Sequence, residues 1–183
     1  MVELLALCAL TWAGGFTAKL VDAHHEHGLD FFPHAGLLFA IAAGLIWGYV
    51  MTRSAILLTG FMGLMFFWIY RLAWDCVNHA IILILILLFA LSSVYRIDSG
   101  YAIAILFGYV LLHHLKIASP SPRWKAVHAF FYKYRLDVLL IPSVYSLFVG
   151  TQGFVVCFTS LGVIAANKVF HIPRHVILPN KQI

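Results

Sequence analysis

Seven apolar runs, separated by short polar or turn-forming segments, divide the chain of 183 residues. Runs of about 17 to 25 apolar residues are typical of transmembrane helices, and backbone that spans lipid must satisfy its own hydrogen bonds. The pattern predicts an all-α polytopic membrane protein, a bundle of about seven transmembrane helices in a single integral membrane domain, 1–183. The predicted spans are 2–27, 36–52, 54–74, 79–95, 101–116, 138–149 and 154–170.

The first and sixth spans each have an alternative. The first is expected to be retained rather than cleaved as a signal peptide, because it carries Glu3 and no Lys or Arg before its apolar run. Its helix is expected to continue to His27, with Gly28 as the residue that ends it. The sixth is short and contains Pro142, so the alternative is a re-entrant hairpin formed by the last two spans.

The one substantial linker, between the fifth and sixth spans, shows a different pattern. Ser121 and Pro122 suit the N-cap and first position of a helix. Over 122–135 the aromatic and aliphatic side chains share one side, and the basic side chains share most of the other. This predicts an interfacial amphipathic helix on the cytoplasmic side, with anionic inner-leaflet lipid as the partner of Arg123–Arg135. A protein surface is the alternative partner.

Composition strengthens the membrane prediction and excludes several classes of function. The chain is 63% hydrophobic and 10% charged, with a mean hydropathy of +0.95, so it cannot cover a globular surface in water. The net charge of +5 is therefore expected to meet lipid headgroups, and nucleic acid is not an expected partner. The three cysteines, Cys8, Cys76 and Cys157, lack the spacing of a disulfide framework or a cysteine zinc site.

Positive charges divide unequally between the two faces that seven spans would create. Ten Lys and Arg side chains and all ten histidines fall on one face, and only Arg53 and Arg96 fall on the other. Cytoplasmic loops carry the excess of Lys and Arg, so the N-terminus is expected outside and the C-terminus in the cytoplasm of a cytoplasmic or plasma membrane. The ten are Lys19, Arg71, Lys116, Arg123, Lys125, Lys133, Arg135, Lys168, Arg174 and Lys181.

The densest group of ionisable side chains ends the first predicted helix. Lys19, Asp22 and Glu26 stand at i, i+3 and i+7 and so share one stripe of that helix, which His25 flanks. Two carboxylates suit a hard divalent cation, and the lysine suits a phosphate. The alternative is a solvated helix end, where the lysine reaches the interface and the histidines complement the helix dipole.

Two further polar groups are predicted on the same face. Arg71 and Asp75 are an i, i+4 pair if the third helix persists, and Asn78 and His79 follow at the start of the fourth. The alternative there is a simple turn with Asn78 as N-cap. His113, near the cytoplasmic end of the fifth span, is expected on an inward polar stripe.

Together these residues predict an integral membrane enzyme of lipid metabolism, of the transferase type. Its substrate is expected to be a lipid or isoprenoid bearing a phosphate at the cytoplasmic leaflet. The expected ligands of a divalent cation, Mg²⁺ or Zn²⁺, are Asp22, Glu26 and Asp75. The expected catalytic residues are Asp22, Glu26, Asp75, His25 and His79, and the expected substrate-binding residues are Lys19, Arg71, Asn78 and His113.

Two other functions would use the same residues. A proton- or metal-ion-coupled transporter or channel would use the histidines and carboxylates along its path. An accessory subunit of a larger membrane complex would use the polar face for docking. The enzyme is favoured over transport because the ionisable groups gather at one face, whereas a transport path usually needs polar groups at depth.

Overall fold

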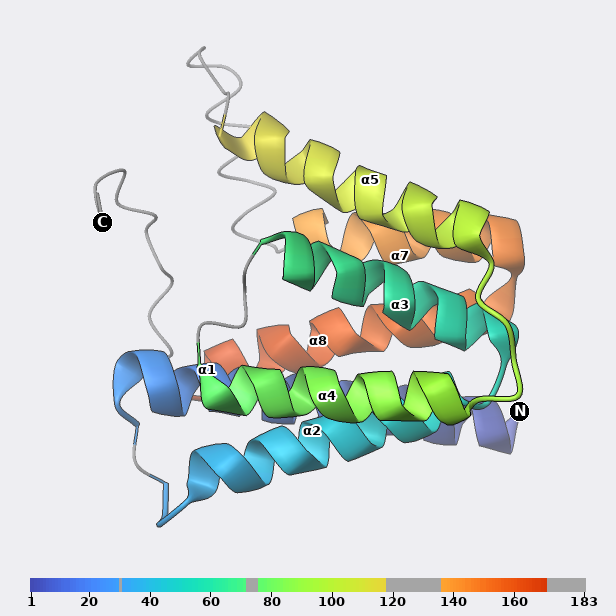
Figure 1. Cartoon of the computed structure of the whole chain (residues 1–183). Helices are drawn as coiled ribbons and strands as arrows, with labels where there is room; N and C mark the ends of the chain where they lie inside the picture. Colours follow the sequence, from blue (N-terminus) through green and yellow to red (C-terminus); the bar gives the residue numbers. More distant parts are fainter. Residues whose placement is uncertain (30, 72–75, 118–135, 171–183) are drawn as a thin grey trace.

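The computed structural model describes residues 1–29, 31–71, 76–117 and 136–170. Within these ranges the chain forms seven α-helices and one 3-10 helix, and no strand, which confirms the all-α prediction. In chain order they are α1 (Val2–His27), α2 (Ala35–Met51), α3 (Ala55–Tyr70), α4 (Val77–Ser92), α5 (Ser99–Ile117), α7 (Leu136–Val149), η1 (Thr151–Gly153) and α8 (Phe154–Val169) (Figure 1).

The helix ends test several of the sequence predictions. The first predicted helix, 2–27, coincides with α1, and Gly28 ends it in a left-handed conformation with φ 63°. The prediction that Asn78 caps the fourth helix is wrong, because α4 begins at Val77 with Cys76 as its N-cap. The interfacial helix at 122–135 and the end of the third span, 72–74, lie outside the described residues.

The helices lie side by side and alternate in direction along the chain (Figure 1). α1 packs against α2 and α8, and α4 packs against α2. α3 packs mainly on α5, and α7 bridges α5 and α8. The main apolar core joins α1, α2, α3, α4 and α8, and a smaller cluster of Phe67, Ile105, Tyr109 and Tyr145 joins α3, α5 and α7.

Alternating directions bring particular helix ends together. The C-terminal ends of α1, α3 and α5 and the N-terminal ends of α2 and α4 lie at one end of the bundle (Figure 1). The start of α1, the turn between α2 and α3, the connection between α4 and α5, and η1 lie at the opposite end. The segments that were predicted to carry chemistry therefore share one end.

Glycine lets α1 and α8 approach at backbone distance. A methyl group on Gly15 of α1 would overlap the carbonyl group of Thr159, and one on Gly162 of α8 would overlap that of Trp12. Gly44 and Gly48, one turn apart on α2, receive side chains of α4 in the same way. Close contact through small residues is characteristic of helix pairs in membranes, where burial of apolar surface from water does not hold helices together.

The outward faces of several helices are apolar at helical spacing. In a protein surrounded by water these stripes would be polar. The exposed apolar side chains include Ile84, Leu87, Leu88 and Leu91 on α4, Ile103, Phe107 and Leu111 on α5, and Val144, Leu147 and Phe148 on α7.

Length and composition set two helices apart. The segments Val2–His25 and Thr151–Val169 are long and apolar enough to cross a membrane. The apolar helical stretches in the rest of the described chain are 10–17 residues long. A signal sequence or a soluble core helix also meets this criterion, so the count of seven spans stays a prediction.

Candidate functional site

Three polar side chains from α1 and α4 meet at the end of the bundle that carries the predicted site. The Asp22 carboxylate accepts hydrogen bonds through both oxygens, Oδ2 from Lys19 Nζ at 2.6 Å and Oδ1 from His79 Nε2 at 2.7 Å. The relative exposures of these side chains are 11% for Lys19, 27% for Asp22 and 10% for His79. We call this group the Asp22 cluster.

Local structure explains how the cluster forms. Lys19 and Asp22 are three residues apart in the last turns of α1, so the helix itself brings them together. His79 lies in the first turn of α4, 57 residues further along the chain than Asp22. The two hydrogen bonds offset part of the cost of removing the carboxylate charge from water.

Gly36, in the first turn of α2, makes the approach of α1 and α4 possible. A Cβ at this position would lie 2.5 Å from Cδ2 of His24 and 2.7 Å from Nδ2 of Asn78. His24 in turn contacts the carbonyl oxygen of Leu29 through Nδ1 at 3.1 Å. Side chains of α1 and α4 therefore meet over the start of α2, next to the Asp22 cluster.

The hydrogen bond to Asp22 determines the tautomer of a neutral His79. An ionised carboxylate only accepts, so the imidazole must carry a proton on Nε2 and keep its lone pair on Nδ1. Asp22 would also stabilise the imidazolium that forms when Nδ1 takes a proton. This pairing of carboxylate and imidazole suits general acid–base chemistry.

A second group lies at the same end on α3 and α5. Tyr70 Oη and His114 Nε2 are hydrogen-bonded at 2.7 Å. Phe67 stacks on Tyr109 with ring centroids 4.9 Å apart and meets the edge of His113 at 6.2 Å. The Arg71 guanidinium lies 5.8 Å from the centre of the Phe67 ring, within the range of a cation–π contact.

The predicted site residues thus divide into three sets. Lys19, Asp22, Asn78 and His79 come together on α1 and α4, beside Gly36 of α2. Arg71 and His113 lie on α3 and α5, where both contact Phe67. His25 is exposed on α1, and neither the side chain of Glu26 nor Asp75 is among the described parts of the structure.

Metal binding by this site stays a prediction. Both oxygens of Asp22 are engaged by Lys19 and His79. Among the residues that the structure describes, no three His, Cys, Asp or Glu side chains are placed to hold one metal ion. The other two expected ligands are the side chain of Glu26 and Asp75, and both lie outside the described parts of the structure.

Sequence reasoning missed four participants. Gly36 was part of an apolar run, and only its position in the first turn of a helix hinted at close approach. His24 was not among the predicted site residues, yet it lies against Gly36. Tyr70 directly precedes Arg71, and His114 directly follows His113, so both adjoin residues that were predicted. The available signal was a polar aromatic residue at the end of each of the two helices.

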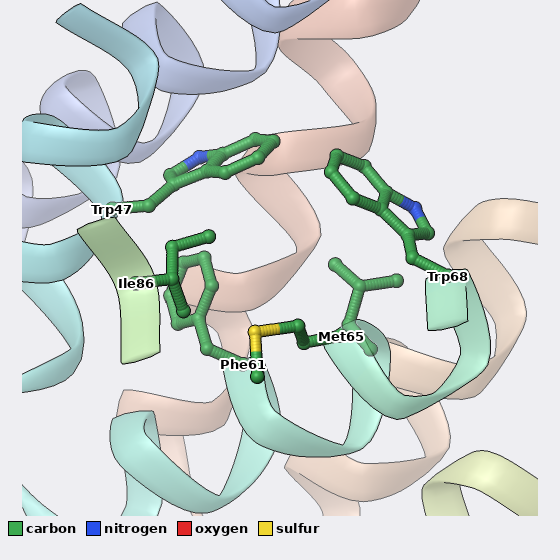
Figure 2. A pocket seen from close by; sticks show the side chains of 6 residues that line it. Trp47, Phe61, Met65, Trp68 and Ile86 are labelled. Atoms are coloured by element: carbon green, nitrogen blue, oxygen red, sulfur yellow. The ribbon is translucent and has the colours of Figure 1, made fainter. Parts of the chain in front are cut away.

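An apolar cluster contributed by α2, α3 and α4 lies inside the bundle. It contains a narrow cavity of about 10 Å³, around which Figure 2 shows the indole rings of Trp47 and Trp68 together with Phe61, Met65 and Ile86. The two indoles meet edge to face with centroids 5.4 Å apart. Ile86 follows His79 by two helical turns on the same stripe of α4, a rise of about 10 Å.

The chain matches no protein-family model, and no curated protein or solved structure shows significant similarity to it.

Proposed function

We propose that the chain is a multi-pass integral membrane protein with about seven spans. The support is the apolar outward surface of α4, α5 and α7, together with glycine-mediated contact between α1 and α8. The excess of Lys and Arg that the sequence predicts on one face favours a cytoplasmic location for the end that carries Lys19 and Arg71. The N-terminus is then outside and the C-terminus inside.

Within that bundle we infer an enzyme that acts on an amphiphile with a phosphate headgroup at the cytoplasmic leaflet. The observation that carries this inference is the Asp22 cluster, a largely buried Lys–Asp–His group at the end of an apolar bundle. Ionisable groups in such surroundings are expensive to keep and are commonly functional.

Each residue has a proposed role. Asp22 fixes the orientation and tautomer of His79, whose imidazole takes or gives a proton. Lys19 stabilises the ionised form of the Asp22 carboxylate and places a positive charge close to the lipid headgroup. Arg71, which follows the last residue of α3, would bind the phosphate. A divalent cation held by Glu26 and Asp75 remains part of the proposal.

The interior of the bundle favours an enzyme over a transporter. The buried polar side chains of the described residues are hydroxyls: Thr11, Thr59, Ser146, Thr159 and Ser160. Thr11 and Ser146 bond to carbonyls of their own helices. A proton or metal path between the two ends would need titratable groups at intermediate depth.

The test uses the purified full-length chain in liposomes that contain polyprenyl phosphate or phosphatidic acid, with Mg²⁺ or with EDTA. Loss of the lipid phosphate or a new lipid product is measured by mass spectrometry. Conversion is expected for the unaltered chain, and His79→Gln should slow it by about 10²-fold or more. His34→Asn, at the exposed start of α2, is the matched control and should keep full activity.

Two results would contradict the proposal. One is the absence of conversion and of binding for both lipid phosphates with the unaltered chain. The other is a His79→Gln variant, correctly folded, that converts lipid as fast as His34→Asn does. Asp22→Asn should resemble His79→Gln in activity, because it removes the acceptor that orients the imidazole.

A further inference from the structure

A cavity of about 330 Å³ opens at the end of the bundle opposite to the Asp22 cluster. Three separate segments line it: the start of α1, the turn between α2 and α3, and η1. Its volume falls in the range of small-molecule sites, which begins at roughly 300 Å³. The proposed enzyme activity makes no use of this cavity.

Among the lining side chains there is one charge of each sign. Glu3 Oε1 lies 3.6 Å from Arg53 Nη2, and the two side chains are 75% and 43% exposed. An exposed ion pair at this distance contributes little to stability, so a ligand can separate it at small cost. The carboxylate and the guanidinium each retain hydrogen-bonding capacity beyond this single contact.

Arg53 is nevertheless held in position. Its guanidinium lies over the Tyr49 ring, 5.0 Å from the ring centroid. The following residue, Ser54, caps α3 by accepting a hydrogen bond from the backbone N–H of Leu57 at 3.2 Å. The turn that presents Arg53 is therefore built into the start of α3 and does not depend on the pairing with Glu3.

Ser54, Thr151 and Gln152 add neutral polar groups to the lining, and the leucines give it an apolar side. Leu7 of α1 and Leu57 of α3 belong to the main core and are 8% and 1% exposed. Leu4 packs against the same core and also lines the cavity. The site thus combines a mouth with paired opposite charges and an apolar wall behind it.

We propose that this cavity binds a zwitterionic ligand of the phosphoethanolamine or amino-acid kind. The ammonium group meets Glu3, the phosphate or carboxylate meets Arg53, and the adjoining carbon atoms lie along Leu4, Leu7 and Leu57. A simple anion would be repelled by Glu3 and a simple cation by Arg53. A zwitterion replaces one loose ion pair with two charge-assisted contacts. The ligand is either a lipid headgroup or a free zwitterion.

The experiment measures binding by the purified full-length chain. The protein is placed in nanodiscs of phosphatidylethanolamine or of phosphatidylglycerol, and the nanodisc is then removed. Native mass spectrometry measures how much of each lipid stays bound to the protein. Free O-phosphoethanolamine and glycine are titrated by calorimetry. The variants are Glu3→Gln and Arg53→Gln, and Arg96→Gln is the control because it removes an exposed charge from the connection between α4 and α5 at the same end.

The expected result is selective retention of phosphatidylethanolamine, or saturable binding of a free zwitterion, by the unaltered chain and by Arg96→Gln. Glu3→Gln and Arg53→Gln should each weaken that binding at least tenfold. Retention of the lipid without binding of the free compounds identifies a lipid headgroup as the ligand, and binding of a free compound identifies a soluble zwitterion.

Other outcomes overturn the proposal. Equal retention of phosphatidylglycerol, with stronger retention in Glu3→Gln, would show a simple anion site. Unchanged binding in both cavity variants, or no binding of any probe by the unaltered chain, would show that the cavity is not a ligand site. Thermal unfolding of each variant checks the fold, and since both altered side chains are exposed, little change is expected. Lipid conversion at the Asp22 cluster is a separate readout, so failure of one proposal does not imply failure of the other.

Discussion

The contact between α1 and α8 gives a prediction whose size can be worked out from the structure. Gly15→Ala adds one methyl group where the backbone of Thr159 already lies, with Thr159 C only 2.8 Å and Thr159 Cα 3.0 Å from the new Cβ. Ordinary van der Waals contact begins at 3.4 Å. The obstacle is backbone, so it cannot move aside by changing a rotamer, and the two helices must separate.

Two effects of opposite sign decide the result. Overpacking costs typically about 1–3 kcal/mol, and we take about 3 kcal/mol because a helix rather than a side chain must move. Alanine is favoured over glycine inside a helix by about 1 kcal/mol. The net loss is then about 2 kcal/mol, which for a chain of this size corresponds to a fall in Tm of about 4–8 °C.

The chain supplies its own probes for the assay. Cys8 and Cys157 are buried, so a thiol-reactive fluorophore labels them when the purified protein unfolds on heating. Gly100→Ala is the control, because Gly100 is exposed and a Cβ there would meet only a side-chain oxygen of Asp98, at 3.3 Å. That variant should keep or slightly raise the Tm.

The double variant sharpens the test. A Cβ on Gly162 would lie 2.7 Å from the backbone nitrogen of Phe16, on the same contact between α1 and α8. Once Gly15→Ala has separated the helices, Gly162→Ala should cost less than it does alone, so the two losses should be less than additive. A Gly15→Ala variant whose Tm equals or exceeds that of Gly100→Ala would refute the reasoning.

Three further predictions concern other parts of the bundle. Ile84→Lys places a charge on the exposed apolar face near the middle of α4. The free energy of membrane insertion should become less favourable by about 2.5–3.5 kcal/mol, so less protein should be found in the membrane fraction. A folded variant in the soluble fraction would contradict the membrane proposal. Asp22→Asn leaves the Lys19 ammonium without its counter-ion and should lower the free energy of unfolding by about 1–3 kcal/mol. Adding Lys19→Met should recover part of this loss. An unchanged Tm in the thermal assay would argue against the pairing. Tyr145→Phe removes the hydrogen bond that its hydroxyl donates to the Ile56 carbonyl at 2.8 Å and should cost about 1 kcal/mol, and a neutral result would mean that the bond adds nothing.

The number and type of helices followed from the sequence because apolar runs and turn residues alternate clearly. Gly28 shows why the end of α1 was predictable: its left-handed conformation is one that glycine adopts without strain. The start of α2 was harder, since His34 caps it with φ 62°, a conformation rare outside glycine. The fourth helix was placed two residues late because Cys76 has no side-chain capping bond to mark it.

The candidate site was predictable only where local geometry decides it. The Lys19–Asp22 pair follows from their i, i+3 spacing on one helix. The partnership of Asp22 with His79 depends on how α4 packs against α2, which no spacing along the chain encodes. The sequence also grouped Arg71 with His79, and in the structure Arg71 ends α3, which packs mainly on α5, whereas His79 begins α4, which packs mainly on α2.

The glycine contact between α1 and α8 also constrains the order of assembly. Gly15 and Thr159, which meet there, are separated by 144 positions along the chain. Contacts between residues so distant in sequence form late and slow folding, because a long loop must close first. During synthesis of most of the chain, Gly15 of α1 therefore lacks the α8 backbone that covers it in the folded structure. A truncated chain that ends before α8 would leave Gly15 of α1 without this contact. We expect such truncated chains to be recognised and degraded.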